Sequence, residues 1–124
     1  MKNKPLIMCI DDDKEFVDSL TAILESGGYR AQAAFSARDG LALYRKQKPD
    51  IVLVDLMMEE VDSGTGFVKE LKAMGPTPPI YILSSVGDNL NMATDYTQLG
   101  LNGVFQKPIN PDTLLSTLRA KLNV

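Results

Sequence analysis

Acidic side chains directly follow two of the short apolar runs in this chain of 124 residues. Asp11, Asp12 and Asp13 come after the run 6–10, and Asp55 comes after another such run. Short apolar runs are typical of buried parallel strands, whose carboxyl ends meet at one crevice of an open sheet. Carboxylates gathered there repel one another unless a cation joins them. The pattern therefore predicts a Mg²⁺ site built around one nucleophilic aspartate, since Mg²⁺ prefers oxygen ligands.

Two more polar side chains occupy similar places. Lys107 lies between a short apolar run and Pro108, and Ser84 follows the run 80–83. Each has an ordinary explanation by itself, a surface lysine or a hydroxyl at a strand end. Opposite a group of carboxylates, however, Lys107 is better interpreted as a fixed positive charge that could stabilise an anionic group. Ser84 could donate a charge-assisted hydrogen bond to the same group.

Strand-like and helix-like segments alternate along the whole chain, which predicts a parallel sheet with helices on both faces. The expected strands cover about residues 5–10, 29–34, 51–54, 79–84 and 103–106. The expected helices cover about residues 14–26, a segment after Ser36, 65–74, 88–100 and a segment after Asn110. Ser36 and Asn110 are typical N-cap residues. The apolar face of the first helix is formed by Phe16, Leu20, Ile23 and Leu24.

Length and composition exclude several classes of protein. The length fits one domain, residues 1–124. A net charge of −3 argues against direct binding to nucleic acid. The absence of histidine excludes a histidine metal site, and the one cysteine, Cys9, is expected to be buried and inert. No apolar run has the length of a membrane span, so we expect a cytoplasmic protein without membrane contact.

Four motifs, taken in order, resemble the receiver domain of bacterial two-component response regulators, the CheY-like superfamily. They are residues 10–13, residues 49–58, residues 80–85 and the pair Lys107–Pro108. The resemblance covers about residues 5–122 and implies a single doubly wound α/β domain of five βα units. Its parallel sheet would have the strand order 2-1-3-4-5, with helices on both faces.

The resemblance also implies how the acidic residues act. Asp55 would be the phosphoacceptor, a carboxylate nucleophile that forms an aspartyl-phosphate. Asp12 and Asp55 would bind Mg²⁺ directly, Asp11 largely through water, and the backbone carbonyl of Met57 would add one oxygen. Asp13 is assigned to helix capping or to the rim of the site.

Further roles are implied for the remaining candidates. Lys107 would pair with Asp55 at rest and with a phosphoryl oxygen afterwards, and with Asp55 and Ser84 it forms the expected catalytic group. Ser84 would bind the phosphoryl oxygen and so bias a two-state switch. Val104 occupies the switch position where the family usually carries an aromatic residue, so this chain departs from the family there. The family often has a cis peptide bond before Pro108, which the sequence leaves open.

The implied function is that of a phosphoacceptor switch, whose catalysis is limited to its own phosphorylation and dephosphorylation. A histidine kinase or phosphotransfer protein would supply the phosphoryl group. The fourth helix, fifth strand and fifth helix would then signal to an output partner or an attached effector domain, or form a phosphorylation-dependent homodimer. The sequence names neither the kinase nor the output.

Three alternatives share parts of this pattern. A phosphate-independent pseudo-receiver would signal only by protein contact, which the retained acidic residues, Ser84 and Lys107 argue against. A Mg²⁺-dependent phosphatase with an aspartate nucleophile would need a different motif after the first strand and a cap domain. A flavodoxin would need a phosphate loop rich in hydroxyls and glycine. The segment 59–66 also departs from the receiver pattern, and we interpret its extra acidic residues as a solvated rim.

Overall fold

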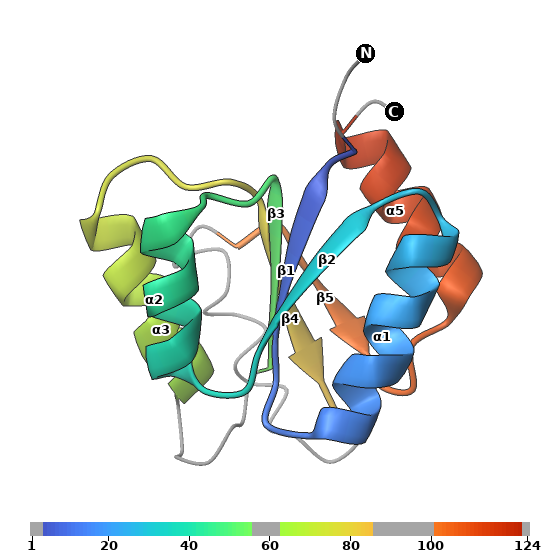
Figure 1. Cartoon of the computed structure of the whole chain (residues 1–124), viewed down its shortest axis with the longest axis horizontal. Coiled ribbons are helices and arrows are strands. Elements are labelled where there is room, and N and C mark those ends of the chain that lie inside the picture. The colour runs from blue at the N-terminus through green and yellow to red at the C-terminus, as the bar shows by residue number, and fades with distance from the viewer. Residues whose placement is uncertain (1–3, 56–62, 86–100, 123–124) are drawn as a thin grey trace.

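The computed structural model describes residues 4–55, 63–85 and 101–122 of the chain. Within these residues, parallel strands form one five-stranded sheet in the order β2-β1-β3-β4-β5 (Figure 1). The strands are β1 (Leu6–Ile10), β2 (Arg30–Ala34), β3 (Ile51–Asp55), β4 (Ile80–Ser84) and β5 (Gly103–Gln106). The strand order predicted from the family resemblance is therefore confirmed.

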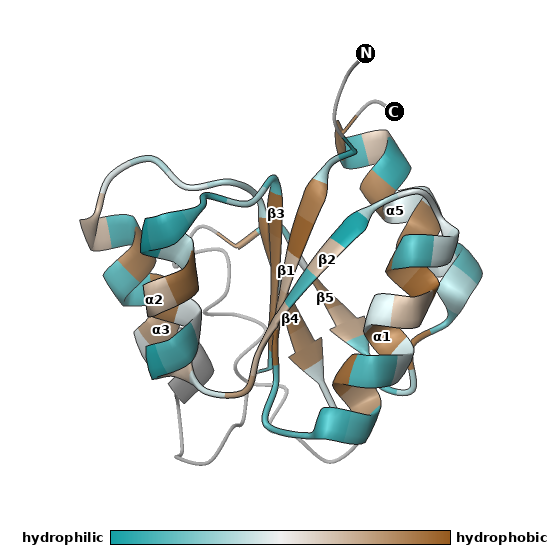
Figure 2. Ribbon diagram, viewed as in Figure 1, coloured by the Kyte–Doolittle hydropathy of each residue, from teal (hydrophilic) through white to brown (hydrophobic). Residues whose placement is uncertain are grey.

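The three central strands are buried along their whole length, which explains their continuous apolar sequences. Figure 2 shows this as hydrophobic residues through β1, β3 and β4. Successive side chains point to opposite faces of the sheet. Met8 and Ile10 thus join the core on one face, whereas Ile7 and Cys9 join the core on the other.

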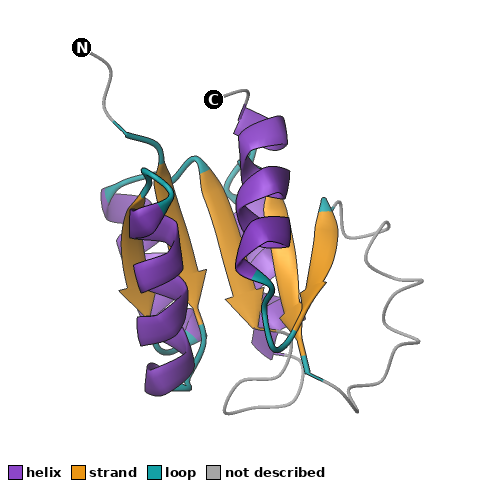
Figure 3. Cartoon of the chain, turned by 90° about the vertical axis from the view of Figure 1, so that its right-hand side faces the viewer, coloured by secondary structure: helices purple, strands orange, loops and turns teal. Residues whose placement is uncertain are grey.

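Helices cover both faces of this sheet. They are α1 (Lys14–Ser26), α2 (Ala37–Lys46), α3 (Ser63–Ala73) and α5 (Pro111–Leu122). Helices α1 and α5 lie side by side on one face, and α2 and α3 lie on the other (Figures 1 and 3). The helix predicted for residues 88–100 falls outside the described residues. On α1 the fully buried apolar residues are Val17, Leu20 and Leu24, so the predicted face is rotated slightly toward Val17.

Side-chain caps determine where the helices begin. The carboxylate of Asp13 accepts a hydrogen bond from the Phe16 N–H at 3.2 Å and caps α1. The same arrangement joins Ser36 to Asp39 at 3.0 Å and Asn110 to Thr113 at 3.1 Å. These caps satisfy N–H groups that have no partner inside the helix. The predicted N-caps of α2 and α5 are therefore confirmed, and α1 begins directly beside the acidic residues.

Candidate functional site

Three carboxylates meet at the carboxyl ends of β1 and β3. Oxygen atoms of Asp11, Asp12 and Asp55 all lie within 4.8 Å of one another. The parallel pairing of Ile10 with Val54 brings Asp11 and Asp55 together, because each directly follows one of these residues, and Asp12 is next along the chain. Asp11 and Asp55 are buried and Asp12 is exposed. The predicted gathering of these three residues is therefore present in the structure.

Asp11 is held in a fixed orientation from two sides. Its Oδ1 accepts a hydrogen bond from the backbone N–H of Asp13 at 3.0 Å. Its Oδ2 accepts one from Nζ of Lys107 at 2.6 Å. Its own backbone N–H donates to the carbonyl of Ala34 at 3.1 Å, which continues the pairing of β1 with β2. The carboxylate is thus anchored by the start of α1 and by the end of β5.

Lys107 reaches the cluster from the segment that follows β5. Its backbone N–H donates to the Ser84 carbonyl at 2.7 Å, and its peptide bond to Pro108 is cis. Its Nζ lies 2.6 Å from Oδ2 of Asp11 and 3.3 Å from Oδ1 of Asp55. The resemblance implies Asp55 as its resting partner, and that ion pair is present, with Asp11 as a second and nearer partner. The reason is that the Asp13 N–H holds one oxygen of Asp11 and leaves the other to face the ammonium group.

The aromatic ring of Phe16 lies against the same ammonium group. Nζ of Lys107 is 4.3 Å from the ring centroid, within the range of a cation–π contact. The sequence predicts Phe16 only on the apolar face of the first helix and does not indicate this contact. The available signal was its position, since it is the first apolar residue after the acidic run and lies in the first turn of α1.

The electrostatics of the cluster are unfavourable for a bare carboxylate. Burial, together with the neighbouring charge of Asp11, raises the pKa of Asp55 to about 6, although Lys107 partly opposes this. Burial would lower the pKa of Lys107, but its hydrogen bond to Asp11 and the nearby carboxylate charges outweigh that effect and raise it. One ammonium group therefore offsets only part of the negative charge, and a bound cation would offset more.

The donor set fits a hard divalent cation. All three side chains offer carboxylate oxygens, which suit Mg²⁺ and give no preference to softer metals. One exposed carboxylate beside two buried ones leaves the cluster accessible to solvent. The fourth expected ligand, the carbonyl of Met57, lies outside the described residues.

Ser84 and Val104 occupy different surroundings. Ser84 is the last residue of β4, is buried, and pairs with Gln106 beside Lys107. Val104 is 43% exposed on β5, away from the core, while Phe105 points inward and packs on Tyr81 with ring centroids 5.2 Å apart. This alternation follows from strand geometry. Ser84 thus borders the carboxylate site, and Val104 faces solvent.

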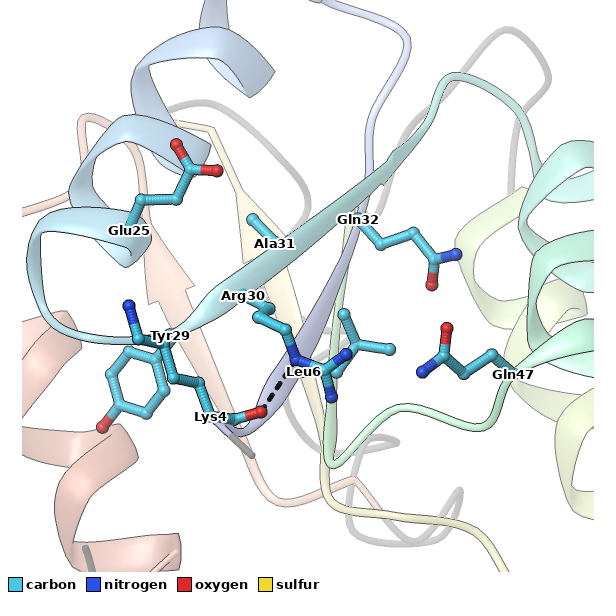
Figure 4. A pocket seen from close by; sticks show the side chains of 8 residues that line it. All are labelled: Lys4, Leu6, Glu25, Tyr29, Arg30, Ala31, Gln32 and Gln47. Atoms are coloured by element: carbon cyan, nitrogen blue, oxygen red, sulfur yellow. Dashed lines mark hydrogen bonds between the residues drawn. The ribbon is translucent and has the colours of Figure 1, made fainter. Parts of the chain in front are cut away.

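Two other features do not belong to the site. Cys9 is fully buried and burial raises the pKa of its thiol, so it is not available as a nucleophile. A pocket of about 560 Å³ lies at the starts of β1 and β2 (Figure 4). Asp55 ends β3 and therefore lies at the opposite end of the parallel strands. In the pocket, Nε of Arg30 donates to the carbonyl of Lys4 at 2.9 Å, and the carboxylate cluster takes no part in the lining.

The family model of the response regulator receiver domain matches residues 7–119 of this chain. The chain belongs to the response regulator receiver domain family. Its cluster of three aspartates is of the kind at which receiver domains bind Mg²⁺. Among the described residues, no helix of this receiver domain combines the length and apolar character needed to cross a membrane.

Several curated proteins resemble this receiver domain. The transcriptional regulatory protein ZraR of Salmonella typhimurium is 34% identical over 122 residues, which are 98% of this chain and 27% of ZraR. Protein PilH of Pseudomonas aeruginosa is 31% identical over 118 residues, which are 94% of this chain and 96% of PilH. The receiver domain thus spans about a quarter of ZraR but nearly all of PilH.

Solved structures agree with this assignment. A CheY-like receiver domain protein from Methanospirillum hungatei superposes with a TM-score of 0.87 at 26% identity, covering 97% of this chain and 94% of that one. A receiver domain protein from Clostridium thermocellum gives a TM-score of 0.86 at 26% identity, covering 96% of this chain and 94% of that one. The match extends over almost the whole doubly wound fold.

Proposed function

We propose that Asp55 accepts a phosphoryl group in a Mg²⁺-dependent reaction and that the domain then acts as a switch. The observation that supports this most directly is the position of Asp55. Its carboxylate ends a buried strand, is adjacent to two other carboxylates, and has an ammonium group 3.3 Å away. A nucleophile, an acidic cation site and a fixed positive charge are the groups that phosphoryl transfer to an aspartate requires.

The reaction follows from the properties of these residues. A carboxylate oxygen of Asp55 forms a new bond to phosphorus, while the bond from phosphorus to a ring nitrogen of the donor histidine breaks. The electron pair of the broken bond stays on that nitrogen, and the other ring nitrogen carries the proton, so a neutral imidazole leaves. The rigid end of β3 holds the Asp55 carboxylate in one place, which favours attack in line with the leaving group.

Asp11, Asp12 and Asp55 are the side chains that would hold Mg²⁺, with the carbonyl of Met57 as a further ligand. The bound ion would neutralise the carboxylates and stabilise charge on the transferring phosphoryl oxygens. Lys107 would supply a second positive charge to the same oxygens. Its present distance from both Asp11 and Asp55 suits a group that changes partner when a phosphoryl group arrives.

The same proposal includes the switch and its partners. Ser84 would donate its hydroxyl to the phosphoryl group, and the surface around Val104 on β5 would carry the change to an output partner or effector domain. A histidine kinase or phosphotransfer protein would be the donor, and the domain would act in the cytoplasm. Its catalysis would be confined to its own phosphorylation and dephosphorylation.

A small acyl phosphate donor tests the central assignment without the cognate kinase. Incubation with the donor and Mg²⁺ should add one phosphoryl group to the wild type, detected by intact mass and removed by hydroxylamine. Asp55→Asn preserves the shape of the side chain but removes the nucleophilic oxygen, and it should remain unlabelled. Asp18→Asn makes the same chemical change at an exposed position of α1 and should label like the wild type. Labelling of Asp55→Asn at the wild-type level would refute the assignment. A wild type that stays unlabelled would favour the pseudo-receiver.

A further inference from the structure

The ammonium group of Lys107 has contacts of two kinds among the described residues. Two of them are carboxylates, Asp11 at 2.6 Å and Asp55 at 3.3 Å. The other is the neutral ring of Phe16, with its centroid 4.3 Å from Nζ. These contacts respond differently to the reaction. A cation on the carboxylates neutralises Asp11, and phosphorylation consumes the charge of Asp55, whereas neither event alters the ring.

Phe16 is itself fixed relative to the site. Its backbone N–H donates to Oδ1 of Asp13 at 3.2 Å, and the N–H of Asp13 donates to Oδ1 of Asp11 at 3.0 Å. Oδ2 of Asp11 accepts from Lys107, whose ammonium group then contacts the Phe16 ring. These contacts form a closed circuit through the first turn of α1. Phe16 also packs against the core cluster beneath α1 and α5, which restricts movement of the ring.

We propose that Phe16 is a positioning residue for phosphoryl transfer, and that its aromatic face holds the Lys107 ammonium group toward Asp55. This inference rests on the function proposed above. The contact with the ring persists after a cation has neutralised Asp11 and phosphorylation has removed the carboxylate charge of Asp55. A cation over an aromatic face is attracted to the negative face of the ring, and the attraction is stronger where water is partly excluded.

The contrasting explanation is that Phe16 only fills space next to the core. The two roles differ in what they require of the side chain. Packing requires volume and an apolar surface, which leucine supplies almost as well. A cation–π contact requires electron density on the ring face, which fluorine atoms withdraw with little change in shape. Graded fluorination of this one ring therefore separates the two explanations.

The experiment measures the phosphorylation rate of Asp55 at saturating Mg²⁺ over a range of acyl phosphate concentrations. Phe16 is replaced site-specifically by mono-, di- and trifluorophenylalanine, and separately by leucine and by tyrosine. We expect the maximal rate to fall stepwise with fluorine number and about 3- to 10-fold in Phe16→Leu, the effect of a partly desolvated cation–π contact. Phe16→Tyr should retain most of the wild-type phosphorylation rate, because the tyrosine ring also has a negative face.

Phe35 offers a matched control within the same chain. Its ring also lies beneath a lysine, with Nζ of Lys14 5.6 Å from the centroid, but Lys14 is exposed and contributes to no proposed step. Trifluorophenylalanine at position 35 should leave the phosphorylation rate unchanged. Suppose that the wild type is phosphorylated but the phosphorylation rate does not fall with fluorine number at position 16, or falls equally with fluorine at position 35. Either result would overturn the role of Phe16.

A second measurement does not depend on phosphorylation. Urea unfolding without Mg²⁺ is compared for the wild type, Phe16→Leu, Lys107→Met and the double variant, which forms a double-mutant cycle. Contact between ring and ammonium group predicts that Phe16→Leu destabilises the protein less when Lys107 is already replaced. Additive effects would refute the contact. If the wild type accepts no phosphoryl group, the proposed function and the positioning role are both refuted, and coupling then shows only that the ring contacts the ammonium group.

Discussion

Replacing Asp55 with asparagine should make the protein more stable at neutral pH in the absence of Mg²⁺. The structure gives the reason, because Asp55 is 4% exposed and shares its surroundings with Asp11 and Asp12. Ionising it there costs more than ionising it in the unfolded chain. Asparagine has nearly the same shape, carries no charge and therefore avoids this cost.

The magnitude follows from the pKa of the carboxyl group. The pKa of Asp55 rises from 3.8 to about 6 in the folded protein. Since each pKa unit corresponds to about 1.4 kcal/mol, ionised Asp55 lowers the free energy of unfolding by roughly 3 kcal/mol. The opposing attraction of Lys107 is already included in this net shift. A difference of this size should raise the melting temperature of the variant by on the order of 10 °C.

The pH dependence has a definite sign. Because the pKa of Asp55 is higher in the folded protein than in the unfolded chain, the folded protein is stabilised when this carboxyl group is protonated. That stabilisation is fully present below about pH 3.8 and is lost as the pH rises through about 6. Asparagine does not titrate. The difference in free energy of unfolding between Asp55→Asn and the wild type should therefore be small near pH 4, increase between pH 4 and pH 7, and reach its maximum above that range.

Urea denaturation in a chelating buffer at several pH values between 4 and 8 measures this difference. Asp18→Asn is the matched control, because it removes an exposed carboxylate from the surface of α1 and should change stability by less than about 0.5 kcal/mol. Saturating Mg²⁺ should stabilise the wild type more than Asp55→Asn, so the stability difference between the two proteins should become smaller. Equal or lower stability of Asp55→Asn at pH 7.5 without Mg²⁺, or a stability difference that does not vary with pH, would refute the reasoning.

Other predictions test the elements that support the site. Gly40→Ala should destabilise the protein by about 1–3 kcal/mol in urea unfolding, because the added Cβ would lie 2.8 Å from Cδ1 of Ile10. Gly66→Ala on α3 is its control and should stabilise by up to about 1 kcal/mol, since a Cβ there would meet nothing within 4 Å. A stable Gly40→Ala variant would show that α2 can move away from the sheet. Asp50→Ala should cost about 1–3 kcal/mol, because its Oδ2 accepts the Leu6 N–H at 2.7 Å, and its melting temperature should fall without loss of Asp55 phosphorylation.

Much of this protein follows from local features of its sequence. Continuous apolar runs predict the buried strands, because a strand covered on both faces needs no polar residue along its length. Ser36 and Asn110 predict the helix starts, because capping depends on residues only three positions apart. Strand ends predicted one residue away from their observed positions reflect the final hydrogen bonds of the ladder, which the sequence does not specify.

The cluster of carboxylates could also be predicted largely from the sequence. Once the strands are parallel and β1 lies beside β3, residues that end each strand must meet at one edge of the sheet. The strand order itself came from resemblance to receiver domains, since alternating strands and helices are compatible with several orders. Residue types and order thus predicted that the three aspartates and Lys107 come together, while the role of the Met57 carbonyl stays a prediction.

Only the tertiary structure decided how those groups contact one another. Lys107 lies 96 positions after Asp11 in the chain. It lies nearer to Asp11 than to Asp55 because the Asp13 N–H orients the Asp11 carboxylate toward the ammonium group. The contact between Phe16 and Lys107 likewise depends on how α1 packs against the sheet beside the end of β5. Sequence spacing determines which side chains reach the crevice. Distances of a few ångströms inside it are determined by packing between segments that are remote in the chain.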